Sequence, residues 1–160
     1  MKDDSSYMKL ALKQAKIAYK KNEVPVGSVL VCDGIILAKS HNLVEVMKDA
    51  TAHAEMLCIK KASQMLGSWR LLGTTLYTTL EPCSMCYGAI MLSRVKRVVF
   101  AAKDIRHGAC GSWVDLSKEK HPTHVLEINS GLYEDEASSL MKEFFQKRRH
   151  EKENAHICIT

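Results

Sequence analysis

The stretch Thr79-Leu-Glu-Pro-Cys-Ser-Met-Cys86, TLEPCSMC, places two cysteines three residues apart directly after a proline. A β-branched and aromatic run at 75–79 precedes it and an apolar segment at 83–93 follows. The stretch therefore predicts a strand, a tight turn and a helix that opens with both cysteines. Residues three apart on a helix share a face, so both thiols can reach one point.

A second stretch upstream, Ala52-His-Ala-Glu55, supplies an imidazole and a carboxylate. Residues 52–66 have helical spacing, and we expect Thr51 to be the N-cap, which puts His53 in the first turn. Helix N-termini carry partial positive charge and favour the thiolate form of cysteine, which is the form that binds metal. Thiolate and imidazole ligands together favour zinc over magnesium or calcium.

The number of matched ligands separates a structural from a catalytic metal site. The sequence offers three matched ligands, His53, Cys83 and Cys86. A structural zinc site instead has four protein ligands. Three ligands leave one position for water, and Glu55 can reach over the metal to take a proton from that water. A redox-active cysteine pair is the alternative for an isolated C-x-x-C motif. We interpret Glu81 as a structural residue that bonds backbone near the Pro82 turn.

Length and composition indicate one globular domain in a cytoplasmic protein. The chain has 160 residues, enough for a proper hydrophobic core. The N-terminal residues do not resemble a signal peptide, so we expect the six cysteines to lie in a reducing compartment rather than to form disulfides. No apolar run approaches the roughly 20 residues of a membrane span. The formal net charge of +5 permits a nucleic-acid partner without demanding one.

Helical and strand patterns alternate along the chain and predict an α/β fold. Asp33-Gly34 between two apolar runs is a strong hairpin signal, and the strands at 76–79 and 97–101 should be parallel because a helix connects them. We expect a single three-layer domain over 1–150, with a central mixed sheet of about five strands flanked by helices. Residues 151–160 form a C-terminal tail, a candidate for disorder. The predicted helices are 4–21, 52–66, 83–93 and 135–149, the strands 26–32, 35–38, 75–79, 97–101 and 125–128, and a polar loop spans 40–50.

His-Ala-Glu followed by Pro-Cys-x-x-Cys resembles the signature of the zinc-dependent nucleoside and nucleobase deaminases. The segment EVPVG at 23–27, Asn42, GACGS at 108–112 and FFQKRR at 144–149 are similar to the tRNA adenosine deaminases of bacteria in particular. This resemblance covers about residues 7–150. It implies a cytidine-deaminase-like fold and hydrolytic deamination of adenosine to inosine at the wobble position of a tRNA anticodon, typically of an arginine tRNA.

The resemblance also implies roles for individual residues. His53, Cys83 and Cys86 match the ligands of one zinc ion per subunit, and Glu55 matches the residue that carries protons. The remaining matches would contact the target nucleoside, in part through backbone: Asn42, Val26, Ala54 and Asp104. It further implies a homodimer that binds the anticodon stem-loop across both subunits.

The zinc motif alone does not separate an RNA substrate from a free base, because guanine and cytosine deaminases share it. Basic residues favour RNA, since phosphate contacts supply much of its affinity, although such residues also complement a helix C-terminus. Trp69 and Trp113 are more often packing residues than stacking platforms. The candidate RNA contacts are Lys103, Arg106, Arg148 and Arg149.

Three hypotheses therefore stand. The first is a tRNA adenosine deaminase, the second a free-base or nucleoside deaminase of the same fold, and the third a non-catalytic RNA-binding module that keeps zinc for structure. The presence of Glu55 argues against the third hypothesis, because a structural zinc site has no use for that carboxylate.

Overall fold

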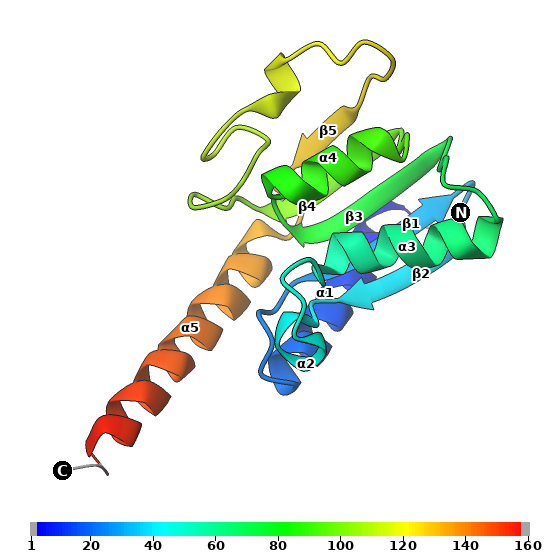
Figure 1. Cartoon of the computed structure of the whole chain (residues 1–160). Helices are drawn as coiled ribbons and strands as arrows, with labels where there is room; N and C mark the ends of the chain where they lie inside the picture. The colour runs from blue at the N-terminus through cyan, green and yellow to red at the C-terminus, as the bar shows by residue number, and fades with distance from the viewer. Residues whose placement is uncertain (1–2, 158–160) are drawn as a thin grey trace.

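A five-stranded mixed sheet with the order β2-β1-β3-β4-β5 forms the centre of the molecule (Figure 1). The computed structural model describes residues 3–157, and their side chains through residue 154. The pairs β1–β2 and β1–β3 are antiparallel, whereas β3–β4 and β4–β5 are parallel, which confirms the predicted mixed sheet. The strands are β1 (Gly27–Cys32), β2 (Ile35–His41), β3 (Thr74–Leu80), β4 (Arg97–Ala102) and β5 (Glu127–Ser130).

Helices cover both faces of the sheet, because successive side chains of a strand point to opposite sides. In β1, Val29 and Val31 pack with Met8 in one apolar cluster, while Leu30 packs with Cys58 in another. The predicted three layers are therefore confirmed. On the first face lie α1 (Asp4–Lys20) and α5 (Glu134–Ile157), on the second α3 (Ala54–Leu66) and α4 (Ser84–Leu92), and a short α2 (Val44–Met47) stands beside the sheet (Figure 1).

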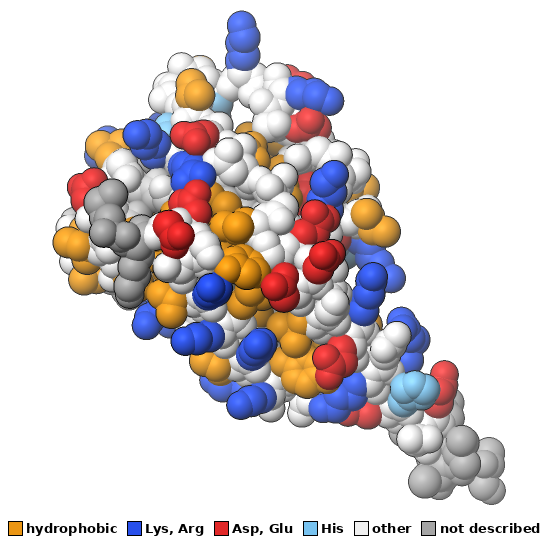
Figure 2. Space-filling model, turned by 180° about the vertical axis from the view of Figure 1, so that it is seen from behind, with side chains coloured by type: hydrophobic (Ala, Val, Ile, Leu, Met, Phe, Trp, Pro, Cys, Tyr) orange, Lys and Arg blue, Asp and Glu red, His pale blue; other side chains and the backbone are white. Residues whose placement is uncertain are grey.

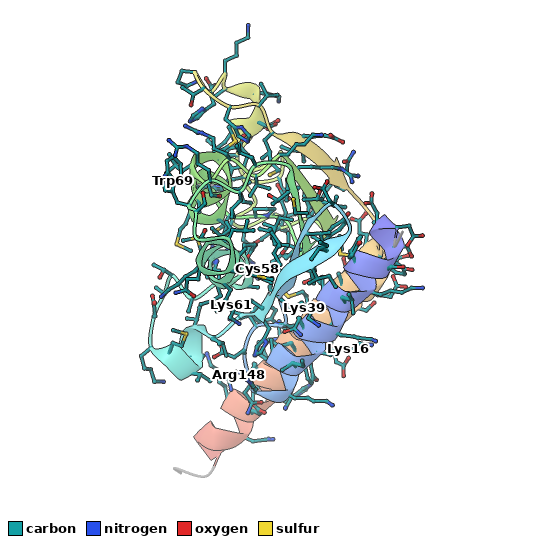
Figure 3. All side chains as sticks on the ribbon, turned by 90° about the vertical axis from the view of Figure 1, so that its right-hand side faces the viewer. Lys16, Lys39, Cys58, Lys61, Trp69 and Arg148 are labelled. Carbon is teal, nitrogen blue, oxygen red and sulfur yellow. The ribbon has the colours of Figure 1, made fainter. Side chains whose placement is uncertain are left out.

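The helices α1 and α5 lie side by side (Figure 3). The rings of Tyr19 and Phe144 meet edge to face, with their centroids 5.8 Å apart. Lys and Arg side chains are intermingled with Asp and Glu on this face, and α5 projects beyond the rest of the molecule (Figure 2). None of the helices among the described residues combines the length and the apolar character needed to cross a membrane.

The hairpin between β1 and β2 forms where the sequence predicts it. Asp33 and Gly34 have φ angles of 46° and 80°, and the flanking residues Cys32 and Ile35 pair across the turn. Two consecutive positive φ angles are what a two-residue turn of the right twist requires. At the start of β1, a Cβ on Gly27 would lie 2.1 Å from the Ala11 carbonyl oxygen, so only glycine lets α1 approach this closely.

Several predicted boundaries are corrected. Helix α3 begins at Ala54 with His53, not Thr51, at the N-cap position. The reason is local: the Thr51 N–H and hydroxyl both donate to the Asp49 carboxylate, at 2.8 and 2.7 Å, which fixes a turn instead of a helix start. The predicted loop at 40–50 contains the end of β2 and α2, and the last strand is 127–130 rather than 125–128.

Helix α5 continues through Ile157, beyond its predicted end at 149. The division between a domain over 1–150 and a tail over 151–160 stays a prediction, and residues 158–160 lie outside the described residues.

Candidate active site

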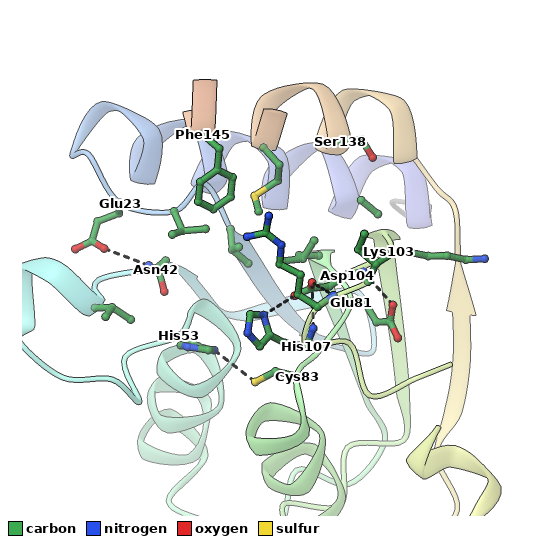
Figure 4. Close-up of a pocket in the computed structure, with 18 of the residues that line it drawn as sticks. Glu23, Asn42, His53, Glu81, Cys83, Lys103, Asp104, His107, Ser138 and Phe145 are labelled. Carbon is green, nitrogen blue, oxygen red and sulfur yellow. Dashed lines mark hydrogen bonds and ion pairs between the residues drawn. The ribbon is translucent and has the colours of Figure 1, made fainter. Parts of the chain in front are cut away.

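One imidazole and two thiols meet where α3 and α4 begin. His53 occupies the N-cap position of α3, Cys83 occupies the N-cap position of α4, and Cys86 lies in the first turn of α4. Their ligand atoms all lie within 4.8 Å of one another, and the His53 ring points toward Cys83 (Figure 4). The residues that the sequence selected from two distant motifs therefore converge in space.

The distances between these atoms fit a tetrahedral zinc ion. His53 Nδ1 lies 3.6 Å from Cys83 Sγ and 3.5 Å from Cys86 Sγ. Zinc binds imidazole nitrogen at about 2.0–2.1 Å and thiolate sulfur at about 2.3 Å, so a tetrahedral angle separates the two atoms by about 3.6 Å. The chemistry and the spacing of the three side chains therefore fit zinc, and with three protein ligands one of its four positions would remain for water.

Hydrogen bonds between the ligands set their protonation. A hydrogen bond from Cys86 lowers the pKa of Cys83 to about 4, with His53 helping and burial opposing. The same contact raises the pKa of Cys86, and burial raises it further. The hydrogen bond with Cys83 also raises the pKa of His53. Because zinc binds the thiolate form, metal binding would release any proton that remains on these sulfurs.

Glu55 lies next to this cluster without belonging to it. It is the second residue of α3, its side chain is 4% exposed, and the cluster of possible ligands within the described chain does not include it. Burial raises the pKa of Glu55 to about 7, against the lowering effects of a backbone hydrogen bond and of His53. A carboxyl group with such a pKa can both accept and release a proton near neutrality.

A pocket of about 1050 Å³ opens over these groups, and His53, Glu55 and Cys83 lie in its lining. Cys86 and Ala54 are fully buried and do not line it. The walls come from the turn after α1, the segment around α2, the loop after β4 and α5 (Figure 4). The other residues that the sequence selected all line the pocket: Val26, Asn42, Lys103, Asp104, Arg106, Arg148 and Arg149.

Residues 1–102 match the family model of the cytidine and deoxycytidylate deaminase zinc-binding region. The chain belongs to this deaminase family. Over 160 residues it is 48% identical to the tRNA-specific adenosine deaminase of Bacillus subtilis, which covers 100% of this chain and 99% of that protein. It is 47% identical over 144 residues to the tRNA-specific adenosine deaminase of Aquifex aeolicus, covering 90% of this chain and 95% of the relative.

Solved structures share the fold of this deaminase. One comes from a study of A-to-I editing by tRNA:A34 deaminases at the wobble position of transfer RNA. It has a TM-score of 0.82 and 41% identity, and covers 85% of this chain and 99% of the other. The guanine deaminase of Bacillus subtilis gives a TM-score of 0.63 and 32% identity, covering 79% of this chain and 83% of the other.

On one wall of the deaminase pocket, a buried carboxylate holds Asn42. The Asn42 Nδ2 donates to Glu23 at 3.1 Å, and both side chains are buried. Sequence reasoning placed Glu23 in a family motif but gave it no role. Nothing in the sequence pairs these two residues, because they lie on either side of the β1–β2 hairpin.

On the opposite wall, Glu81 organises the loop after β4. It is 2% exposed and accepts the N–H groups of Asp104, Cys110 and Ser112, at 3.1, 2.9 and 3.2 Å, together with the Ser112 hydroxyl. A Cβ on Gly108 would lie 2.4 Å from the Glu81 carboxyl carbon, so glycine is required there. Glu81 is structural, as predicted, but its partners lie in this loop and not around Pro82.

Asp104 shapes the turn at the mouth of the pocket. Its Oδ1 accepts the N–H groups of Arg106 and His107, at 3.0 and 3.3 Å, and its side chain is 17% exposed. Both hydrogen bonds go to the same carboxylate oxygen of Asp104 and stay within the loop. A contact between Asp104 and a nucleoside stays a prediction.

Basic and aromatic side chains share the rim. Arg148 and Arg149 come from α5, as does Phe145, which Figure 4 shows above the pocket. Neither tryptophan is a core residue: Trp113 is 58% exposed at this pocket and Trp69 is 54% exposed elsewhere, and their role in packing or stacking stays a prediction. Composition gives no signal of which aromatic residues face solvent.

Proposed function

We propose that this protein is a zinc-dependent hydrolase that deaminates adenosine to inosine at the wobble position of a tRNA anticodon, releasing ammonia. One observation carries the proposal: a cluster of three zinc-ligand side chains lies at a pocket that is also lined by a buried carboxyl group with a pKa of about 7. The full-length identity of 48% to a tRNA-specific adenosine deaminase selects the substrate class.

His53, Cys83 and Cys86 would hold the zinc ion. When bound, zinc supplies Lewis-acid chemistry that lowers the pKa of water at its open position to about 7. Glu55 takes the proton of the attacking water and delivers it to ring N1 of adenine, which makes C6 a better electrophile. Glu55 then carries the second proton of that water to the amino group, which leaves as ammonia. Burial of Glu55 keeps bulk water from exchanging these protons.

The target adenine must leave the anticodon loop to reach Glu55, because its reactive carbon is not accessible inside a base stack. We assign Asn42 and Val26, which line the pocket, to the base and its ribose. A contact through the backbone at Ala54, which does not line the pocket, stays a prediction. The pocket volume of about 1050 Å³ is at the upper end of ligand pockets, which leaves room for flanking nucleotides around the extruded one.

The phosphates are assigned to Lys103 and Arg106 on the loop after β4, and to Arg148 and Arg149 on α5. Two elements far apart in sequence bring these cations to one rim, which supports an RNA contact over an effect on the helix terminus alone. Asp104 holds the loop in shape and so fixes the direction in which Arg106 leaves it.

We also propose that two copies form a homodimer through the face of α3 and α4. An apolar hollow of about 450 Å³ lies there, and its lining residues Trp69 and Leu92 are 54% and 65% exposed. Trp69 points away from α1 and α5 (Figure 3). Exposed apolar surface of this kind marks protein interfaces. A cytoplasmic location stays a prediction, supported by the reduced thiols that the zinc site needs.

The experiment that tests the substrate uses an anticodon stem-loop with a wobble adenosine, followed by nucleoside mass spectrometry. Free guanine, cytosine and adenosine are incubated in parallel. Inosine from the stem-loop alone supports the proposal. Deamination of a free base or nucleoside, with no reaction of the stem-loop, would instead establish a free-base or nucleoside deaminase of the same fold. No product from any substrate, with zinc bound, would favour a non-catalytic RNA-binding module.

A further inference from the structure

Glu23 is a fully buried carboxylate just after the end of α1. Its Oε2 accepts the Asn42 Nδ2–H and the backbone N–H of Glu45, both at 3.1 Å. Its Oε1 accepts the backbone N–H of Val46 at 2.7 Å. Burial of a charge is unfavourable unless hydrogen bonds compensate it, and these three donors come from a single segment of the pocket wall.

The contact with Glu23 fixes which way the Asn42 side-chain amide faces. A carboxylate only accepts hydrogen bonds, so the amide nitrogen must face Glu23. Turning the amide by half a rotation would place two oxygen atoms against each other in a buried site. The backbone of Asn42 is held as well, because its N–H donates to the Val26 carbonyl at 3.0 Å. Oδ1 and the second N–H of Asn42 therefore have one orientation.

This orientation bears on the pocket. Asn42 is 5% exposed and lies between Glu23 and His53 (Figure 4). It lines the pocket together with Glu55. A pre-oriented amide presents its acceptor and its donor to a nucleoside at fixed places, whereas a freely turning amide offers either one.

Glu23 also caps α2 from a distance. The N-cap residue of α2, Leu43, has no side chain that could accept a hydrogen bond from the first turn. The carboxylate of Glu23 supplies that acceptor for Glu45 and Val46. The same residue therefore fixes the amide of Asn42 and the backbone that continues from it along the pocket wall.

We propose that Glu23 is a positioning residue for deamination: it locks the Asn42 amide in the orientation that binds the target nucleoside. This inference rests on the proposed function, in which Asn42 contacts that nucleoside. Glu23 does not touch the reacting atoms. Its effect on catalysis passes through Asn42, and this separates it from a residue that only stabilises the fold.

A double-mutant cycle tests the coupling. Glu23→Gln keeps the size of the side chain but adds a donor, so the Asn42 amide can bind it in either orientation. We expect kcat/KM for the anticodon stem-loop to fall about 10-fold, the worth of one misplaced hydrogen bond. In the Asn42→Ala background the same change should cost clearly less, because only its effect on the α2 backbone at Glu45 and Val46 remains.

Glu81→Gln is the matched control, since Glu81 is an equally buried carboxylate that holds a different wall. The fold-loss in kcat/KM caused by Glu81→Gln should be the same in the wild-type and the Asn42→Ala backgrounds, because the two residues act independently. Equal losses from Glu23→Gln in both backgrounds, or no loss in either, would overturn the inference. If Glu23→Gln does not fold, Glu23→Asp, which keeps the charge at a shorter reach, enters the same cycle.

A measurement without turnover separates this inference from the proposed function. In ¹⁵N-labelled protein, the Asn42 side-chain amide resonance, assigned by its absence in Asn42→Ala, should show slow hydrogen exchange. Glu23→Gln should shift this resonance and speed its exchange, while Glu81→Gln leaves it in place. An Asn42 resonance that is indifferent to Glu23→Gln refutes the lock, even for a protein that turns over no RNA. Wild-type protein that is inactive on the stem-loop refutes the proposed function alone.

Discussion

Replacement of Glu55 by glutamine separates proton transfer from metal binding. Glu55→Gln keeps the shape of the side chain but cannot exchange protons, and Glu55 lies outside the cluster of ligand atoms. A single general acid–base group contributes about 10²–10⁴ in rate. Because Glu55 is 4% exposed, bulk water is a poor substitute for it, so we expect a loss well above the lower end of this range. The predicted fall in kcat is about 10³-fold, equivalent to about 4 kcal/mol.

The assay is single-turnover deamination of the anticodon stem-loop, with zinc content measured on the same protein by plasma mass spectrometry. Glu136→Gln is the control, because this glutamate is exposed at the start of α5 and does not line the pocket. Zinc should stay at one ion per chain in both variants. Loss of zinc from Glu55→Gln would make the carboxylate a ligand, and activity within tenfold of wild type would refute its role as proton carrier.

Three further predictions concern metal, RNA and stability. Cys83→Ser should abolish both zinc binding and deamination, measured as zinc content and inosine yield; retained zinc would remove Cys83 from the ligand set. Arg149→Ala should weaken stem-loop binding and reduce the slope of log affinity against log salt by about 1, whereas Lys16→Ala on α1 should not; equal slopes would place the RNA elsewhere. Asp4 pairs with Arg97 at 2.7 Å, and this hydrogen bond lowers the pKa of Asp4 in the folded protein. The ion pair therefore stabilises the fold at pH values above 3.8, the ordinary pKa of aspartate, and this stabilisation is lost as the pH falls below that value. Since Asp4 is 40% exposed, the effect is below about 1 kcal/mol; acid titration of unfolding should show a smaller pH dependence for Asp4→Asn, and an unchanged one contradicts the assignment.

The metal ligands could be predicted because local geometry determines their placement. Cys83 and Cys86 are brought together by one helical turn, and His53 lies within two residues of Glu55 at another helix start. Local spacing fixes each half of the site, whereas the resemblance to the deaminase signature indicated that the two halves meet. The alternation of helical and strand patterns along the chain predicted a sheet covered on both faces, and Val29 and Leu30, which pack in different clusters, lie on its two sides.

The carboxylates that hold the pocket walls could not be assigned partners. Glu23 bonds Asn42 across the intervening hairpin, and Glu81 bonds a loop that follows the next strand. Such pairs depend on which residues the tertiary structure buries together. The periodicity of apolar residues predicts helices and strands, but it does not predict these long-range partners. The four-residue α2 was missed because one turn is too short to show helical spacing.

The end of α5 was missed for a different reason. The side chains of residues 150–154 are exposed and show no apolar stripe. Pairs one turn apart support it instead: Glu151 lies 3.2 Å from Arg148 and 3.9 Å from Lys147. Such pairs add only a few tenths of a kcal/mol each, and sequence alone gives them little weight against the absence of apolar residues.

The most direct test of the central claim maps the deaminated positions in whole tRNA. Unmodified total tRNA is incubated with the zinc-loaded protein and sequenced, so that inosine is read as guanosine in place of adenosine. The account predicts this change at the wobble position of an anticodon and at no other adenosine. Changes spread over many adenosines, or none at any concentration of active protein, would contradict it.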